Sequence, residues 1–443
     1  MFDTSCPALA PRRARSEAGW RIPAQEVADP LDLNLKVIFN LDMLQPRVAL
    51  VLAASACSAP ATPVMPDASN AEVNAFDVPL DGLSRDDIAR FDEGDALFDL
   101  PFRSADGLGP LFIRTSCGAC HAEGSRGPGL VQKLAIVEAD GVTPAADQSA
   151  LAWGHTARPG MAAGATTPIA PPDRPGVKVT IRIGPPVLGR GYLEAVSDAE
   201  LLRLEAEQAA RGDAIHGKVN RAPFASLPNP DASYGGPRPG ELVIGKLGLK
   251  SRIAMLDDFT ADAFQGDMGL TTAMRPTELV NPDGLTDDLR AGVDLDQEHI
   301  DRIAFYLRRI AIPRRVGVTE RGAAVFAQAA CAACHVPALR TRSDYPIPQL
   351  AGIDAPIYSD LLVHDMGAAL ADGVTDGNAP STAWRTAPLI GLRFTLTYLH
   401  DGRAHSVTEA VLAHDGEARG ARDAFQALSP DDQRSLLEFV EAL

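Results

Sequence analysis

Apolar residues recur at helical spacing in several segments of the chain, and polar residues mark where these segments begin. Ser84 precedes a segment in which Ile88 and Phe91 lie on one side and acidic residues fill the first turn, so a helix is expected to start there. Two more amphipathic helices are expected later, at 296–310 and at 429–443.

The chain between these helices carries weaker signals. Residues 177–183 alternate β-branched and basic side chains, which predicts a strand, and residues 192–211 favour a helix. The Gly- and Pro-rich stretches 161–176 and 228–240 are expected to be loops. The first half of the chain therefore contains a long insertion of loops and short strands.

A five-residue motif, C-x-x-C-H, occurs twice, at 117–121 and at 331–335. It is the attachment signature of a c-type haem, because two thiols about one helical turn apart reach the two vinyl groups of one porphyrin and the His presents a ring nitrogen to the iron. A zinc site or a thioredoxin-like pair also uses C-x-x-C, but neither needs a His after each pair, and no βαβ pattern surrounds either motif. The expected haem-attachment residues and iron ligands are Cys117, Cys120, His121, Cys331, Cys334 and His335.

The two motifs sit in similar surroundings. Each follows a segment that begins with Gly and ends with Phe, 94–98 and 322–326, and each half of the chain ends in an amphipathic helix. This is the plan of a cytochrome c domain. We expect a mainly α fold with two cytochrome c-type haem domains, at 80–313 and 314–443, the first carrying the insertion.

A Pro follows each motif, Pro128 in the first half and Pro348 in the second. These positions resemble the cytochrome c loop in which a Pro carbonyl accepts the N–H of the proximal His. Each of these two carbonyls is therefore expected to fix the ring of its iron ligand.

Composition and charge narrow the class of partner. With 443 residues, 46% hydrophobic and 22% charged, the chain has the composition of a soluble globular protein. The formal net charge of −17 argues against nucleic acid, which needs a basic surface, and suits a basic redox partner. Four of the six cysteines lie in the two motifs, so no disulfide framework is expected.

Covalent haem attachment points outside the cytoplasm, so an export signal is expected. A start at Met43, an apolar run at 48–54 and small residues before Cys57 have the plan of a bacterial lipoprotein signal, and the run is too short to span a bilayer. Cleavage near Ala56 without a lipid is the alternative. The expected segments are a mis-called extension at 1–42, a signal peptide ending at Cys57 at 43–57 and a flexible tether at 58–79. The protein is thus expected to be periplasmic, in contact with the membrane only through a lipid anchor.

Besides the haem motifs, six segments form a recognisable combination: 107–110, 189–196, 266–271, 361–367, 398–403 and 409–414. With them the chain, from about Phe91 to Leu443, resembles the di-haem oxidoreductases classed as peroxidases (also labelled thiol oxidoreductases), distant relatives of bacterial di-haem cytochrome c peroxidases. The resemblance implies hydrogen peroxide or another small molecule as substrate and a small redox protein, a cytochrome c or a cupredoxin, as electron donor. Relatives often hold calcium between domains, but no compact run of acidic ligands identifies such a site here.

The resemblance also implies the ligands of the second haem. His400 matches the His of the relatives' H-D-G-R segment, near the C-terminal haem. Fourteen residues further on the relatives place an axial ligand, and that position is His414 here. A haem held by His335 and His414 would suit electron storage or transfer, and Met366 is the competing ligand.

Asp267 lines up with the Glu of the relatives' Glu-Met-Gly segment, which serves the open haem. It is the candidate acid–base at the N-terminal haem, where it would take a proton from the near oxygen of H2O2 and return it to the far one. An ordinary surface or turn carboxylate is the alternative.

The relatives have a Trp where this chain has Leu249, so Trp153 or Trp384 becomes the candidate for electron transfer between the haems.

Several further residues are weaker candidates. His155 is a possible removable sixth ligand at the first haem, and Arg126 and Arg182 are possible partners of haem propionates or of peroxide, because guanidinium groups suit carboxylates. Solvated or core hydrogen-bonding side chains are expected for His216, His299, His364 and His405.

The expected function is a periplasmic di-haem c-type oxidoreductase that reduces hydrogen peroxide with electrons from a small redox protein. One alternative is a di-haem enzyme that oxidises an organic or protein substrate through a high-valent state. The other is a pure electron carrier in which both irons are six-coordinate.

Overall fold

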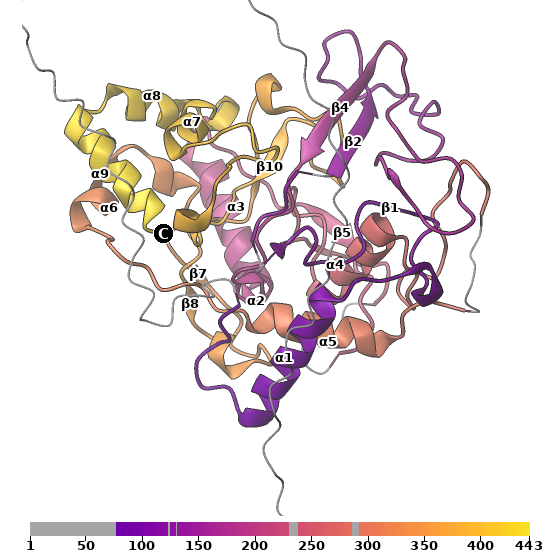
Figure 1. The fold of residues 1–443 in the computed structure, drawn as a ribbon. Coiled ribbons are helices and arrows are strands. Elements are labelled where there is room, and N and C mark those ends of the chain that lie inside the picture. Colours follow the sequence, from indigo (N-terminus) through magenta and orange to yellow (C-terminus); the bar gives the residue numbers. More distant parts are fainter. Residues whose placement is uncertain (1–76, 123–124, 130, 230–237, 286–291) are drawn as a thin grey trace, which may run out of the picture. The chain divides into compact units, whose positions relative to one another are not determined.

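The computed structural model describes residues 77–122, 125–129, 131–229, 238–285 and 292–443 (Figure 1). The chain divides into two units, Met1–Met65 and Pro66–Leu443, and every described residue belongs to the second. The predicted extension, signal peptide and Cys57, and most of the predicted tether, lie outside the described residues. In the described part no helix is both long enough and apolar enough to cross a membrane.

Helices provide most of the regular structure, as expected for a mainly α fold. They are α1 (Arg85–Asp99), α2 (Arg190–Ala195), α3 (Asp198–Arg211), α4 (Leu256–Ala263), α5 (Gln297–Arg309), α6 (Glu320–Gln328), α7 (Val407–Leu412), α8 (Arg419–Ala427) and α9 (Pro430–Glu441). A wider π turn, Phe264–Met268, continues α4 without a break.

The strands are short and form two-stranded antiparallel ribbons. These pair β1 (Leu111–Phe112) with β3 (Gly160–Met161), β2 (Val131–Ile136) with β4 (Val177–Arg182), β5 (Arg221–Pro223) with β6 (Leu242–Ile244), β7 (Leu339–Arg340) with β8 (Asp354–Ala355), and β9 (Val363–Asp365) with β10 (Ala383–Arg385). The predicted strand at 177–183 is thus confirmed as β4, in the expected insertion.

Three predicted helices are confirmed together with their starts. The side chain of Ser84 accepts a hydrogen bond from the backbone N–H of Asp87 at 3.0 Å at the start of α1. Asp296 and Ser429 cap α5 and α9 in the same way. The first N–H groups of a helix have no partner within the helix, and a polar side chain three residues earlier in the chain can accept from them. Because this pattern is local, the sequence alone locates the start of each of these helices.

The single helix predicted at 192–211 is wrong, because the chain forms two helices there. Val196 leaves the helical conformation and forms a β-bridge with Thr341, and the side chain of Ser197 then caps α3. A contact with a residue far along the chain therefore overrides the local helix preference.

Each half of the chain packs an entering helix against a leaving helix, α1 on α5 and α6 on α9 (Figure 1). A Gly lies at each crossing. A Cβ on Gly94 would come 2.5 Å from the carbonyl oxygen of Arg302, and one on Gly322 would come 2.6 Å from that of Ser435. The repeated Gly in the two segments before the motifs is therefore explained by the close approach of two helix backbones.

The Phe that ends each of these segments reaches the motif that follows. The ring of Phe98 lies 6.2 Å from that of His121, and the ring of Phe326 lies 6.4 Å from that of His335. The two halves thus repeat the same arrangement of Gly, Phe and His.

The buried core does not stop at the boundary predicted at 313–314. Its largest cluster joins Phe91 and Ile303 from the first half to Leu339, Leu361 and Ile390 from the second. A smaller cluster around Val325, Phe425 and Phe439 belongs to the second half alone. The two halves therefore share much of their apolar burial.

Candidate functional site

Both C-x-x-C-H motifs fold in the same way. The backbone N–H of His121 donates to the carbonyl of Cys117 at 2.8 Å, and that of His335 donates to the carbonyl of Cys331 at 3.0 Å. This hydrogen bond closes a single helical turn, and residues three apart on such a turn lie on the same side of it, as the two cysteines of each motif do.

The two imidazoles are held in one tautomer. Nδ1 of His121 lies 3.0 Å from the carbonyl oxygen of Ser125, and Nδ1 of His335 lies 3.1 Å from that of Tyr358. A carbonyl oxygen only accepts, so each Nδ1 carries the proton and each Nε2 keeps its lone pair. Both rings are therefore prepared to bind a metal through Nε2.

The prediction that Pro128 and Pro348 supply these carbonyls is wrong. The accepting oxygens belong to Ser125, before the first Pro, and to Tyr358, ten residues after the second. A backbone carbonyl fixes each His ring, as expected. Which residue supplies that carbonyl depends on the path of the loop that follows each motif.

Burial keeps the ligand atoms neutral. It lowers the pKa of His121, where Arg190 adds to the effect, and it lowers the pKa of His335 to about 4. Burial also raises the pKa of the Cys117 thiol to about 12 and that of Cys331 to about 11. Thiols that stay protonated are poor nucleophiles, which disfavours the thioredoxin-like alternative.

The positions of the potential ligand atoms disfavour a zinc site at either motif. Among the described residues, one group of three potential ligand atoms converges, and it is Cys334, Asp360 and His364. Neither motif brings its own two sulfur atoms and imidazole nitrogen together in this way, as a zinc site would require.

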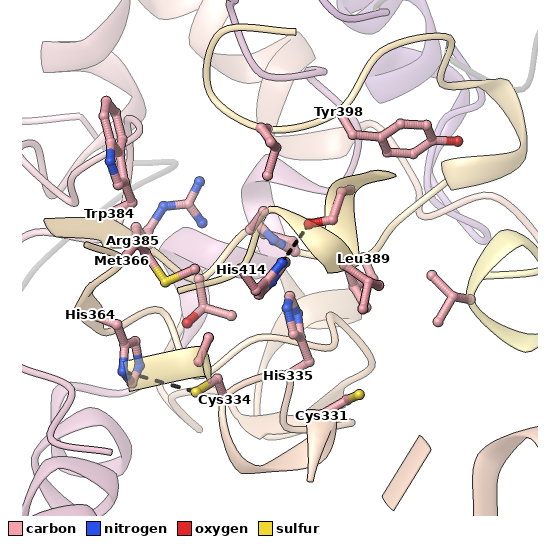
Figure 2. A pocket seen from close by; sticks show the side chains of 18 of the residues that line it. Cys331, Cys334, His335, His364, Met366, Trp384, Arg385, Leu389, Tyr398 and His414 are labelled. Atoms are coloured by element: carbon pink, nitrogen blue, oxygen red, sulfur yellow. Dashed lines mark hydrogen bonds between the residues drawn. The ribbon is translucent and has the colours of Figure 1, made fainter. Parts of the chain in front are cut away.

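A cavity of about 260 Å³ opens beside the second motif (Figure 2). Its lining includes Cys331, Cys334, His335, Met366, Trp384, Arg385, His400 and His414, together with Arg126 and Arg190 from the first half of the chain. Segments more than 280 residues apart in the sequence thus build one site, with the arginines from the first half beside the motif of the second.

His414 lies next to His335 in this cavity, directly after α7 (Figure 2). Its Nδ1 donates to the carbonyl of Ala410 at 2.7 Å, so its Nε2 keeps a lone pair as the other two do. Burial lowers the pKa of His414, and the proximity of His414 contributes to the low pKa of His335. Met366, the competing ligand, lines the same cavity (Figure 2).

Asp267 lies in the π turn after α4, beside the first motif. Its backbone oxygen accepts from the N–H of Ile113 at 2.6 Å, and its carboxylate raises the pKa of both Cys117 and Cys120. Burial raises the pKa of Asp267 itself to about 6, with Lys133 acting in the opposite direction. π turns are rare and occur frequently at functional sites.

Basic side chains surround this carboxylate. Lys133 on β2 donates to the hydroxyl of Thr156 at 2.7 Å, and burial lowers its pKa to about 8. Arg252 acts on Asp267 as well but forms an ion pair with Asp262. Asp267 is therefore a partly accessible carboxylate in a mixed-charge environment, and its carboxylate forms no ion pair with a described residue.

The weaker candidates Trp384, Trp153 and His155 differ in burial. Trp384 is buried in the second cavity, where its ring stacks on His400 at 3.7 Å, whereas the side chain of Trp153 is 39% exposed. His155 is exposed and donates from Nδ1 to the carbonyl of Leu134. Of the two tryptophans, only Trp384 lines the cavity beside a haem motif.

Arg182 is not available for a propionate. It forms ion pairs with Asp372, at 2.8 Å from its Nε, and with Asp376, at 2.7 Å from its Nη1. The prediction made for Arg182 is wrong because carboxylates nearly 200 residues away neutralise it, and no local pattern announces them.

His364 has more partners than its position in the sequence predicts. It is a core hydrogen-bonding residue, as expected, but it also lies 3.9 Å from the sulfur of Cys334 and between the carboxylates of Asp360 and Glu417. Burial opposes the charged ring, yet the hydrogen bonds outweigh it and raise the pKa of His364 well above its usual value. Asp360, four residues before His364, was the available signal. The other three, His216, His299 and His405, are partly or largely exposed, as expected.

Two half-buried imidazoles, each neutral, each with a free Nε2 and each beside a cysteine pair, have the chemistry of a di-haem protein. The chain belongs to the family described as "Di-haem oxidoreductase, putative peroxidase", whose model matches residues 54–138 and 173–443. It is therefore an oxidoreductase of a family that carries two haems. Both motifs, Asp267 and the lining of the second cavity lie within the matched residues.

Two solved structures are similar to the chain at low identity. Hydrazine synthase from Kuenenia stuttgartiensis is 14% identical, with a TM-score of 0.37, over 90% of this chain and 100% of the other. The di-haem peroxidase BthA from Burkholderia thailandensis is 15% identical, with a TM-score of 0.34, over 80% of this chain and 86% of the other. No curated protein matches the chain.

Proposed function

We propose that the protein is a periplasmic di-haem peroxidase that reduces H2O2 with electrons from a small redox protein. Both haems would be attached covalently, through Cys117 and Cys120 in the first half and through Cys331 and Cys334 in the second. His121 would hold the iron of the first haem and His335 that of the second. This proposal extends the established family assignment to a substrate, a form of attachment and a location.

The observation that carries the proposal is the difference between the two sites. The second has an additional imidazole, His414, with a free Nε2 in the cavity of His335. The first has a carboxylate, Asp267, whose pKa burial raises to about 6. A second His closes an iron to ligands and suits electron storage, while a carboxylate that titrates near neutrality suits proton transfer.

A haem held by His121 would supply a binding position for the peroxide and the electrons that reduce it. Asp267, in its ionised form, would take a proton from one oxygen of H2O2 and return it to the other as the O–O bond breaks. The overall balance is H2O2 + 2 e⁻ + 2 H⁺ → 2 H2O. Lys133 helps to keep Asp267 ionised, since its charge acts against the rise of that pKa.

The electron donor and the location follow from charge and from the N-terminal segment. A net charge of −17 would attract a basic cytochrome c or cupredoxin. Export and a lipid on Cys57 remain part of the proposal because the sequence around Met43 has the plan of a lipoprotein signal.

The test compares Asp267→Asn with Asp99→Asn in the holoprotein. Asp99 is an exposed carboxylate that also acts on Cys117, so it controls for the loss of charge near the first motif. Asp267→Asn should lower peroxide turnover at least 100-fold, within the range for losing a general acid–base, while haem content stays at two per chain. Asp99→Asn should keep nearly full turnover.

The visible spectrum separates the alternatives. A high-spin ferric signal in the resting or half-reduced protein that disappears on addition of H2O2 supports an open first haem. Two low-spin haems that ignore peroxide would leave a pure electron carrier. Equal turnover in Asp267→Asn and the wild type would remove Asp267 from the mechanism.

A further inference from the structure

Three arginines that are distant in the sequence meet beside the second cavity. Arg126 follows the first haem motif, Arg190 is the first residue of α2, and Arg385 is the last residue of β10 (Figure 2 shows Arg385). The side chains of Arg190 and Arg385 are almost fully buried, with 7% and 6% of their surface exposed. We refer to Arg126, Arg190 and Arg385 as the arginine cluster.

The hydrogen bonds of the cluster go to backbone carbonyls rather than to carboxylates. Arg126 donates to Leu399 at 2.5 Å and also to Thr397, Arg190 donates to Pro186 at 2.6 Å, and Arg385 donates to Gly248 at 2.8 Å. Nη1 of Arg385 is buried and has no hydrogen-bond partner in the described structure. These bonds fix the orientation of the guanidinium groups but leave their charge uncompensated.

Three other buried cations in the described part of the chain form ion pairs with carboxylates. Arg182 pairs with Asp372, Lys250 pairs with the same carboxylate, and Arg308 pairs with Glu194 and Asp257. Within the described ranges, no member of the arginine cluster forms an ion pair with a carboxylate. Asp401 acts on Arg126 and Asp360 acts on Arg385 only at longer range.

Electrostatics agree with this geometry. Burial lowers the pKa of Arg190 to about 9, and the charges of Arg385 and Arg126 lower it further in the same direction. All three guanidinium groups still carry their charge at neutral pH. Burying an ion without a counter-ion is unfavourable, so the two buried guanidinium groups of Arg190 and Arg385, with the half-buried Arg126 near them, favour the binding of an anion that the described residues do not supply.

We propose that the arginine cluster is an anion site that binds the propionate carboxylates of the haem held by His335. The cluster lines the same cavity as Cys331, Cys334 and His335, and a haem attached there would bring two carboxylates with it. Guanidinium groups bind carboxylates through paired N–H donors, which matches the free Nη1 of Arg385. This inference rests on the proposed function in one respect, the presence of a haem at His335.

The cluster also has a predictable effect on that haem. Reduction adds an electron to the iron, and nearby positive charge favours the reduced state. Arg190 in addition contributes to the low pKa of His121, so the cluster lies within electrostatic reach of both motifs. Its charge therefore raises the reduction potential of the C-terminal haem and helps it to accept electrons.

The test uses the holoprotein and the separate variants Arg190→Met and Arg385→Met. Haem content should stay at two per chain, because thioether attachment does not involve the cluster. In each variant the reduction potential of the haem held by His335 should fall by about 59 mV. For a one-electron reduction this corresponds to a tenfold shift of the equilibrium toward the ferric state. Arg385→Lys keeps the charge and should shift the equilibrium less. Arg434→Gln, an exposed residue paired with Asp431, should leave the potential unchanged.

Adding acetate distinguishes the two possible sources of the bound carboxylate, the haem propionates and a free anion from solution. In the wild type the potential should not depend on acetate concentration, because the propionates already fill the site. A potential that responds to acetate would assign the cluster to a free anion instead, and unchanged potentials in both Met variants would overturn the proposal. If the potentials shift as expected but H2O2 is not reduced, the anion site stands and the proposed peroxidase function fails. A chain with no haem at His335 would refute both.

Discussion

At the scale of single residues, the chemistry depends on protonation states that the surroundings fix. His121, His335 and His414 each donate from Nδ1 to a backbone carbonyl, which leaves Nε2 unprotonated. Asp267 is the opposite case, because its carboxylate forms no ion pair with a described residue and burial raises its pKa to about 6. These protonation states suit the roles that we propose, iron ligands for the three histidines and a proton carrier for Asp267.

The first prediction concerns the pH dependence of turnover. Asp267 acts as a base in its ionised form, so kcat/KM for H2O2 should rise through pH 6, with about tenfold lower activity at pH 5 than at pH 7. The groups that face Asp267 are Lys133 on β2, Asp262 on α4 and Arg252 before α4, and of these Lys133 and Arg252 lower its pKa while Asp262 raises it.

Lys133→Met provides the internal check on this profile. Removing that positive charge should move the midpoint of the rate profile to higher pH, since Lys133 favours the ionised carboxylate. An acid limb that persists unchanged in Asp267→Asn would assign the titration to another group.

At the scale of elements, glycines allow the backbones that carry the site to approach closely. Gly191 lies in α2 between Arg190 and the buried Glu194, where α2 crosses α5. A Cβ on Gly191 would come 2.0 Å from the carbonyl oxygen of Arg308. α2 therefore reaches the position that places Arg190 at the cavity because its second residue has no side chain.

Gly191→Ala should destabilise the protein by about 1–3 kcal/mol, because backbone atoms would have to move apart. Gly420→Ala is the matched control: it lies in α8 with no atom near its added Cβ, so higher helix propensity should leave stability equal or slightly greater. Urea unfolding of the two holoproteins measures both changes. Equal stability of Gly191→Ala and the wild type would show that α2 and α5 can separate without cost.

At the scale of the whole described unit, buried charge connects the two halves. Arg308 on α5 forms ion pairs with Glu194 of α2, at 2.8 Å, and with Asp257 of α4, and all three side chains are fully buried. The hydroxyl of Tyr345, from the second half, donates to Glu194 at 2.8 Å. The position of α2 is thus fixed from both halves of the chain.

Arg308→Met should cost about 3–5 kcal/mol, because it leaves two carboxylates buried without a counter-ion. The triple variant Arg308→Met with Glu194→Gln and Asp257→Asn should recover much of that loss, since no charge is then buried. Denaturant unfolding of both variants at pH 7 tests this. A triple variant as unstable as the single one would mean that packing, rather than charge, accounts for the effect.

Much of the fold could be predicted from short sequence patterns. The caps at Ser84, Asp296 and Ser429 located three helices, because a capping side chain and its N–H partner are only three residues apart. The helix predicted at 192–211 failed because Val196 pairs with Thr341, a contact of 145 residues' separation that no local pattern contains.

The sequence by itself predicted two haems for this protein, and the family to which the chain belongs carries two haems. Each C-x-x-C-H motif holds the two thiols and the imidazole of one predicted site within five residues, so the candidate haem-binding groups are neighbours in the sequence whatever the fold. For the same reason the sequence predicts His121 and His335 as iron ligands without any knowledge of the fold.

Only the tertiary structure decided how these sites are completed. Which carbonyl fixes each ring, which arginines lack a counter-ion and which His shares a cavity with His335 all depend on chain segments that meet after folding. Arg182 and Arg190 are the same residue type, and the sequence does not distinguish their roles. In the structure Arg182 lies beside carboxylates and forms an ion pair, whereas Arg190 lies near other arginines and belongs to the proposed anion site. The physical reason is that charge compensation depends on distance in space, which the order of residues does not specify.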